Sequence, residues 1–137
     1  MFSAMNIAES GMSGNQEWLR TISNNISNMN TTRTEDGGPY KRQTVIFEQQ
    51  NSFDDLFKTQ VGDGVRVKEV KKDAAEQLTY DPEHPDANEE GYVRMPAIDM
   101  SAEMSNMIMA QRAYESNVTT FNSIKQVMQK QLEIGKI

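Results

Sequence analysis

Residues 99–134 read DMSAEMSNMIMAQRAYESNVTTFNSIKQVMQKQLEI, and this stretch decides the fold class. Large, mostly apolar side chains recur in it every seven residues: Met100, Met107, Tyr114, Phe121 and Met128. A second series is interleaved with the first: Met104, Gln111, Val118, Lys125 and Leu132. Alternating steps of three and four place both series on one face of a helix. We therefore expect a helix from about Asp99 to Ile134, roughly 50 Å long, capped by Asp99 or Ser101 and terminated near Gly135.

The other end of the chain has a similar pattern, which predicts a helix from about Ser3 to Asn28, roughly 40 Å long. One apolar series consists of Met5, Met12, Leu19 and Ile26. The interleaved series consists of Ala8, Asn15, Ile22 and Met29. Gly11 and Gly14 lie inside this helix, and each costs about 1 kcal/mol relative to Ala. The helix is therefore weak alone and needs a partner.

The middle of the chain predicts a short β region. Residues 28–39 and 81–91 are rich in Asn, Asp, Gly and Pro and are typical of loops. Alternating or β-branched residues predict strands in segments 40–48, 65–70, 77–80 and 92–95. Segment 51–60 carries apolar residues at helical spacing and is ambiguous between a helical turn and a loop.

The expected fold class is therefore mainly α with a small β insertion. The long N- and C-terminal helices are expected to pack as an antiparallel-type coiled coil, with the short β region between them. Three parts follow from this interpretation: 1–39 with the first helix and a polar loop, 40–97 with the β region, and 98–137 with the second helix. Both apolar stripes are too large for the polar middle to cover, so a partner helix or another subunit must cover them.

Composition points away from an enzyme. The chain has 137 residues, with 14 Lys and Arg against 20 Asp and Glu, which gives a net charge of −6. An acidic protein repels phosphate backbones, so nucleic acid is a poor partner. The chain has no Cys and a single His, which excludes disulfides, thiolate catalysis, zinc–thiolate sites and sites built on two imidazoles. We expect no catalytic residue and no cofactor.

The hydrophobic runs are short. None approaches the roughly 18–20 residues that span a bilayer, so we expect no membrane span. The first residues, MFSAMNIAESGMSGNQEWLR, lack a basic region followed by an apolar one, and we expect no cleavable secretion signal.

The acidic run DPEHPDANEEG at 81–91 is the one candidate for a metal site. Counted from Asp86, a calcium loop of the EF-hand type requires Glu at its twelfth position, where this chain has Ala97. Two Pro residues stiffen the run, and His84 has no second His or nucleophile near it in the sequence. We interpret the run as a solvated turn and expect no metal ligand.

Several stretches carry a resemblance to a known family. SNNISNMNTT at 23–32, at the end of the first helix, resembles the signature of the flagellar basal-body rod and hook family. TTRTEDGGPY at 31–40, YDPEHPDA at 80–87 with GYVRMP at 91–96, and MAQRAYESNV at 109–118 are similar to its proximal-rod members.

The resemblance implies a structural protein without enzymatic activity or cofactor. Family members are exported unfolded by the flagellar type III apparatus, without a cleavable signal, and assemble in the periplasmic space. There they form a helical tube, the rod, which acts as a drive shaft that transmits torque from the membrane ring to the hook. The implied partners are further copies of the chain, other proximal and distal rod proteins, the membrane-ring and export-gate adaptor at the rod base, and the export apparatus.

In such a tube the terminal helices of many subunits pack together, so the two stripes predict the contacts between subunits. Asn24, Asn25 and Asn28 would supply amide donors and acceptors at these contacts; a frayed helix end is the alternative. The complete set of expected interface residues is Met5, Met12, Leu19, Ile22, Asn24, Asn25, Ile26, Asn28, Met100, Met104, Met107, Tyr114, Val118, Phe121, Met128 and Leu132.

Three alternatives remain open from the sequence. The first is another axial subunit of the rod and hook family. The second is a helical chaperone that binds a client through its apolar stripe, although such a protein would lack the β insertion. The third is a calcium-binding module built on the acidic loop.

Overall fold

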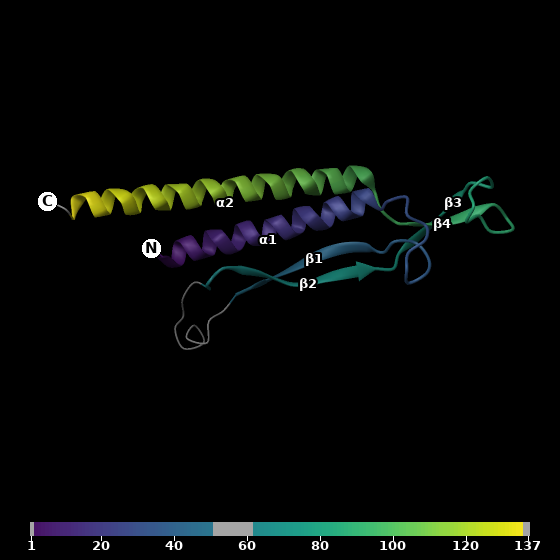
Figure 1. Cartoon of the computed structure of the whole chain (residues 1–137), viewed down its shortest axis with the longest axis horizontal. Helices are drawn as coiled ribbons and strands as arrows, with labels where there is room; N and C mark the ends of the chain where they lie inside the picture. Colours follow the sequence, from purple (N-terminus) through teal and green to yellow (C-terminus); the bar gives the residue numbers. More distant parts are fainter. Residues whose placement is uncertain (1, 51–61, 136–137) are drawn as a thin grey trace.

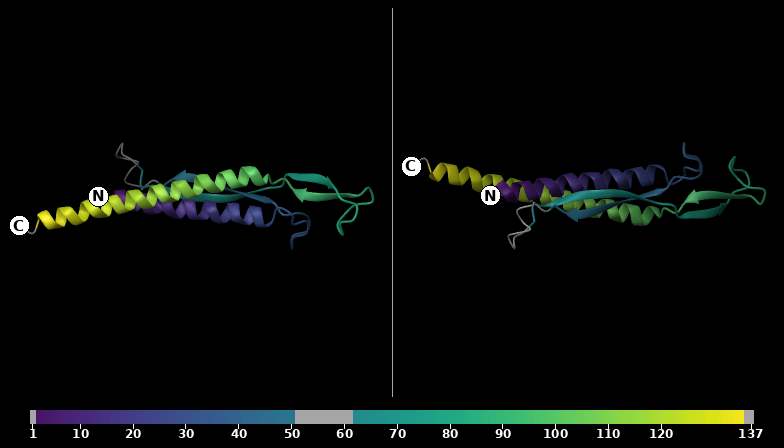
Figure 2. Two further views of the ribbon diagram at one scale, coloured as in Figure 1. Left: turned by 90° about the horizontal axis from the view of Figure 1, so that it is seen from above. Right: turned by 90° about the horizontal axis from the view of Figure 1, so that it is seen from below.

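The computed structural model describes residues 2–50 and 62–135. Two long helices, α1 (Phe2–Ser27) and α2 (Met100–Ile134), lie side by side and run antiparallel, as Figure 1 shows. The N-terminus of α1 and the C-terminus of α2 are at the same end of the molecule, and α2 extends further than α1 at that end (Figures 1 and 2). The predicted pair of long terminal helices with a β region between them is confirmed.

The β region forms two separate hairpins. Strands β1 (Arg42–Gln49) and β2 (Val65–Asp73) pair antiparallel, with a bulge between Ile46 and Phe47. Strands β3 (Glu76–Tyr80) and β4 (Tyr92–Pro96) form a second antiparallel pair. The β1–β2 ribbon lies along α1, whereas β3 and β4 project beyond the helices (Figure 1). The ambiguous segment 51–60 lies outside the described residues.

The ends of α2 are close to those predicted. Asp99 is the N-cap: its carboxylate accepts hydrogen bonds from the backbone N–H groups of Ser101 at 2.8 Å and Ala102 at 3.4 Å. Gly135 follows the last helical residue, and its N–H donates to the carbonyl of Gln131 at 3.1 Å. The first helix begins and ends one residue before the predicted limits.

The buried line of α2 differs from the predicted stripe. Positions that are buried or half-buried in the structure alternate at steps of three and four: Glu103, Met107, Ala110, Tyr114, Asn117, Phe121, Ile124 and Met128. The predicted series from Met107 to Met128 belongs to this line. Most of the interleaved series lies off the face that α2 turns to the rest of the chain, since Met104 is 51% exposed and Leu132 is 69% exposed, whereas Val118 is half-buried. The true second series contains Glu103 and Asn117, polar residues that a search for apolar periodicity passes over.

The two glycines of α1 allow close packing on two sides. A Cβ atom on Gly11 would lie 2.6 Å from Nδ2 of Asn117 on α2, and one on Gly14 would lie 3.0 Å from Cε1 of Phe47 on β1. Phe47 also packs edge-on against Trp18 of α1, with ring centroids 6.1 Å apart. Each glycine therefore lowers intrinsic helix stability but lets a neighbouring element approach α1.

Candidate assembly surfaces and the buried polar cluster

A polar cluster lies where α1, β1 and α2 meet, and we call Asn25, Tyr40, Arg42, Gln43 and Glu103 the buried polar cluster. Asn25 of α1 and Glu103 of α2 are both 1% exposed. The Asn25 amide donates to the backbone carbonyl of Gln43 at 2.8 Å and to Oε2 of Glu103 at 3.3 Å. Its oxygen accepts from the Gln43 N–H at 2.9 Å and from the Tyr40 hydroxyl at 3.1 Å. All four hydrogen-bonding positions of this carboxamide are therefore used.

The Glu103 carboxylate is balanced by an ion pair. Its Oε1 lies 2.8 Å from Nε and 2.6 Å from Nη2 of Arg42, whose side chain is 29% exposed. Arg42 also donates from Nη1 to Oγ1 of Thr44 at 2.9 Å. Within residues 2–50 and 62–135, every buried side-chain nitrogen and oxygen has a hydrogen-bond partner. The cost of burying a carboxylate is thus offset by a cation and an amide.

The Asn25 carboxamide also forms hydrogen bonds with backbone groups on the edge of β1 that faces away from β2. It bonds both the N–H and the carbonyl of Gln43, as a neighbouring strand would. This arrangement ties the β1–β2 ribbon to α1 and occupies an otherwise open strand edge. Burial, and to a smaller degree the negative charge of Glu103, raises the pKa of the Tyr40 phenol.

The three asparagines expected at contacts between subunits occupy different environments. Asn25 has its hydrogen bonds within the chain and belongs to the fold. Asn28 donates to the carbonyl of Asn24 at 2.9 Å and accepts from the Thr31 hydroxyl at 3.2 Å, so its side chain caps an ordered end of α1 within the chain. Asn24 has an exposed side chain. Sequence reasoning missed Tyr40 and Glu103 as partners of Asn25, and Arg42 as the partner of Glu103.

The remaining predicted interface residues range from buried to exposed. Ile22 is 2% exposed, so its burial is accounted for within one chain. Residues that are half-buried are Met5, Met12, Leu19, Ile26, Met107, Tyr114, Val118, Phe121 and Met128. Residues that are exposed are Met100, Met104 and Leu132.

An apolar strip lies on the solvent side of α2. Met100, Met104 and Ile108 are 39%, 51% and 51% exposed, and they follow one another at steps of four along one helix face. We call these three residues the outer strip. Ile108 was not among the predicted interface residues. Large exposed apolar side chains gathered on one face are typical of interaction surfaces.

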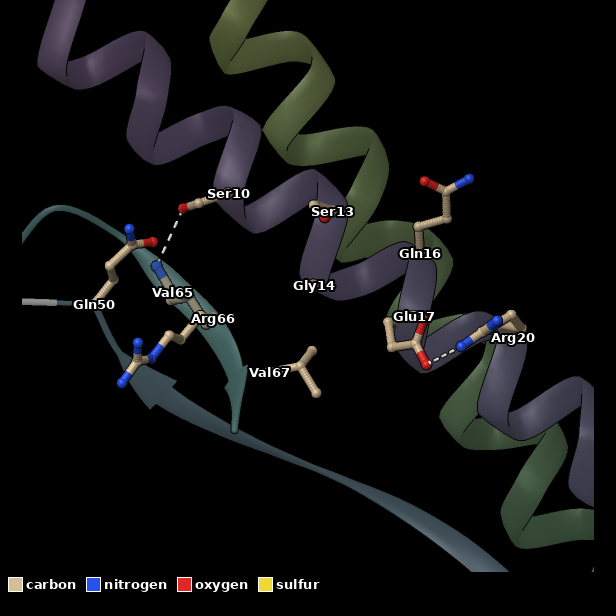
Figure 3. A pocket seen from close by; sticks show the side chains of 10 residues that line it. All are labelled: Ser10, Ser13, Gly14, Gln16, Glu17, Arg20, Gln50, Val65, Arg66 and Val67. Carbon is tan, nitrogen blue, oxygen red and sulfur yellow. Dashed lines mark hydrogen bonds and ion pairs between the residues drawn. The ribbon is translucent and has the colours of Figure 1, made fainter. Parts of the chain in front are cut away.

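A groove of about 760 Å³ separates α1 from β2 (Figure 3). At one end Ser10 holds the elements together, because its Oγ donates to the carbonyl of Ile7 at 2.7 Å and accepts from the Val65 N–H at 3.1 Å. Further along α1, Glu17 and Arg20 form an ion pair at 2.5 Å. The groove is lined by Ser10, Ser13, Gly14, Gln16, Glu17, Arg20, Gln50, Val65, Arg66 and Val67.

The acidic run at 81–91 uses its side chains to shape the loop. Asp86 accepts from the Thr32 hydroxyl at 2.8 Å and pairs with the guanidinium of Arg33, which joins this loop to the one after α1. The hydrogen bond from Thr32 and the contact with Arg33 lower the pKa of Asp86. Oδ1 of Asn88 accepts from the N–H groups of Glu90 at 3.0 Å and Tyr92 at 2.8 Å.

Two absences concern only the described part of the chain. No helix there is long and apolar enough to cross a membrane. No group of three or more His, Cys, Asp or Glu side chains there could hold a metal ion.

Comparison with known proteins connects both helices to one family. The model of the family described as "Flagella basal body rod protein" matches residues 5–33, and "Flagellar basal body rod FlgEFG protein C-terminal" matches residues 89–134. The flagellar basal-body rod protein FlgC of Borreliella burgdorferi is 40% identical, over 98% of this chain and 97% of its own length. FlgC of Bacillus subtilis is 35% identical over 98% of both chains. FlgC of Salmonella typhimurium is 32% identical over 99% of this chain and 98% of its own length.

Proposed function

Since the chain belongs to the FlgC family of flagellar basal-body rod proteins, we propose that the outer strip of α2 is where it contacts neighbouring rod subunits. The chain is a structural subunit of the flagellar basal-body rod, in a family not known to be enzymatic, and it assembles with other rod proteins. FlgC relatives that match nearly the whole chain favour this function over the chaperone and calcium-module alternatives. The FlgC relatives also favour this subunit over other axial members of the rod and hook family.

The observation that carries the proposal is the exposure of Met100, Met104 and Ile108 on a helix whose opposite side is already covered. Burial of apolar surface contributes roughly 25 cal/mol per Å², so such a strip favours association when a neighbour covers it. Met side chains adapt their shape, which suits a surface that must fit neighbours of different sequence. Leu132, 69% exposed near the end of α2, would extend these contacts.

Within one subunit, we propose that α1 and α2 pack as an antiparallel coiled coil. The buried positions of α2 support this, because they follow the alternating steps of three and four residues from Glu103 to Met128. The close approach of Asn117 to Gly11 supports it at one point along the pair. A stiff helix pair of this kind suits a subunit of a shaft that transmits torque.

The finer placement in the flagellum is proposed from the family resemblance. The subunit would lie in the proximal rod, within the periplasmic space, after export by the flagellar type III apparatus without a cleavable signal. Its partners would be further copies, other proximal and distal rod proteins, and the membrane-ring and export-gate adaptor at the rod base.

Ile108→Asp tests the assembly surface. The side chain is half exposed in the isolated chain, so the variant should fold and be exported, yet cells should lack filaments because a carboxylate would be buried between subunits. The matched control is Ser116→Asp, which places the same charge at an exposed polar position of the same helix. Fractionation and swimming assays on cells that carry only the variant gene give the result. Normal swimming of the Ile108→Asp strain would show that the outer strip is not a contact surface.

A further inference from the structure

The apolar contacts between α1 and α2 do not by themselves fix how far one helix is shifted along the other. On α2, the large half-buried side chains Met107, Tyr114, Phe121 and Met128 recur every seven residues. A shift of seven residues, about 10 Å along the axis, that brings Ala110 to the position of Glu103 would put Tyr114, Phe121 and Met128 in place of Met107, Tyr114 and Phe121, and Gly135 in place of Met128. A small residue faces α2 at Gly11 on the other helix, and the Met side chains adapt to altered surroundings. The seven-residue repeat of this line therefore distinguishes the two registers only weakly.

The buried polar cluster does not tolerate such a shift. Glu103 is 1% exposed, and its partners come from two other segments: Asn25 on α1 at 3.3 Å and Arg42 on β1 at 2.6 Å. A shift of seven residues would bring Ala110 to the position of Glu103. The carboxylate would then lose its amide and its guanidinium, and Asn25 would lose an acceptor. A displaced register is disfavoured because it leaves these polar groups unpaired.

Asn25 extends the same constraint to the ribbon. Its carboxamide bonds both backbone groups of Gln43, so β1 can shift along α1 only if both hydrogen bonds break. Arg42, the neighbouring residue of β1, holds Glu103 of α2. The positions of α1, α2 and β1 along the long axis are therefore coupled at one place.

We propose that the buried polar cluster is a register lock: it selects one axial alignment of α1, α2 and the β1–β2 ribbon. Replacing a buried ion pair by apolar residues of similar volume is often neutral or stabilising, so stability alone does not explain why a charge is buried here. A single buried polar residue that fixes the register of paired helices is the best supported role for such groups. The lock also determines where the outer strip lies relative to the ribbon, a consequence that rests on the proposed function.

The test measures the register directly in the purified full chain. The sequence has no Cys, so Ser23→Cys and Ser123→Cys provide two unique sites for spin labels on exposed positions of α1 and α2. In the register that pairs Asn25 with Glu103, these two positions are offset by about 27 Å along the helix axis. Pulsed electron–electron double resonance should give one narrow distribution of distances between the two spin labels in this otherwise unchanged chain.

Two variants in this labelled background decide the matter. In the apolar variant Arg42→Met, Glu103→Leu, which keeps the hydrogen bonds of Asn25 to Gln43 and Tyr40, we expect a second distance population displaced by about 10 Å, while the thermal unfolding midpoint is retained. In the transplanted variant Glu103→Ala, Ala110→Glu, the carboxylate should return to Arg42 and Asn25 by a seven-residue shift, which shortens the distance by about 10 Å.

The proposal is overturned if the apolar variant keeps the single original distance. Should the apolar variant fail to fold, the transplanted variant decides alone, and an unchanged distance there overturns the proposal equally. Neither measurement involves the rod. Failure of the register lock would therefore leave the assembly surface standing, and failure of the Ile108→Asp test would leave the register lock standing.

Discussion

Replacing Gly11 by Ala sets helix propensity against the packing of the two long helices. Inside an isolated helix, Ala is favoured over Gly by about 1 kcal/mol, so a free α1 would gain stability. In the folded chain the new Cβ would lie 2.6 Å from Nδ2 and 3.1 Å from Cγ of Asn117. Inserting a methyl group into a well-packed site costs about 1–3 kcal/mol. Because Nδ2 ends a rotatable side chain that can move partly aside, we expect the clash to cancel the gain in helix propensity and to lower the free energy of unfolding by at most about 1 kcal/mol overall.

The assay is equilibrium unfolding in urea, followed by far-ultraviolet circular dichroism. Asn117→Ala removes the group that meets the new methyl, so the double variant should recover most of the loss, with a coupling free energy of about 1–2 kcal/mol. Ser13→Ala, at an exposed position of α1, is the matched control and should change stability by less than about 0.5 kcal/mol. A gain of about 1 kcal/mol from Gly11→Ala, additive with Asn117→Ala, would refute the close approach of the helices at this point.

Two further predictions concern titratable groups. Thr32→Val removes the main cause of the low pKa of Asp86, so that pKa should rise in a carbon-detected magnetic resonance titration. Because a lowered folded pKa stabilises the fold above the unfolded pKa and the gain is lost as pH falls, the variant should lose less stability in acid; an unchanged Asp86 pKa would contradict this. Burial and the charge of Glu103 raise the pKa of Tyr40 in the folded chain. Because the unfolded chain then loses this proton at lower pH than the folded chain, the free energy of unfolding should fall as pH rises above about 10 and through the folded pKa. Tyr40→Phe should remove that alkaline loss in urea titrations and cost about 1 kcal/mol at neutral pH; an equal alkaline loss in both proteins would contradict the assignment.

The long helices could be predicted because apolar periodicity is a property of neighbouring residues. Side chains three and four apart share one helix face whatever the rest of the chain does, and Asp99 identifies the start of α2 by its own chemistry. The strand segments were also predicted, with edges that shifted by up to three residues. β2, for example, continues to Asp73 beyond the predicted end at residue 70 because its partner β1 begins at Arg42.

The inner face of α2 could not be predicted in the same way. Both flanks of the line from Met107 to Met128 fit a helical stripe, and the flank with Met104 and Leu132 is the more apolar. The structure buries the other flank, because Glu103 finds Arg42 and Asn25, which are 61 and 78 positions away in the sequence. Pairing over such distances depends on how the ribbon folds back along α1, and local pattern carries no information about it.

The most direct test of the assembly surface is a photocrosslink in the rod itself. Benzoylphenylalanine placed at position 104, on the outer strip, should crosslink this chain to another rod subunit in isolated basal bodies, with the partner identified by mass spectrometry. The same residue at position 107, which is half-buried, should crosslink mainly within the chain. If position 104 gives no crosslink between subunits although the chain is present in the basal body, the outer strip does not contact neighbouring subunits.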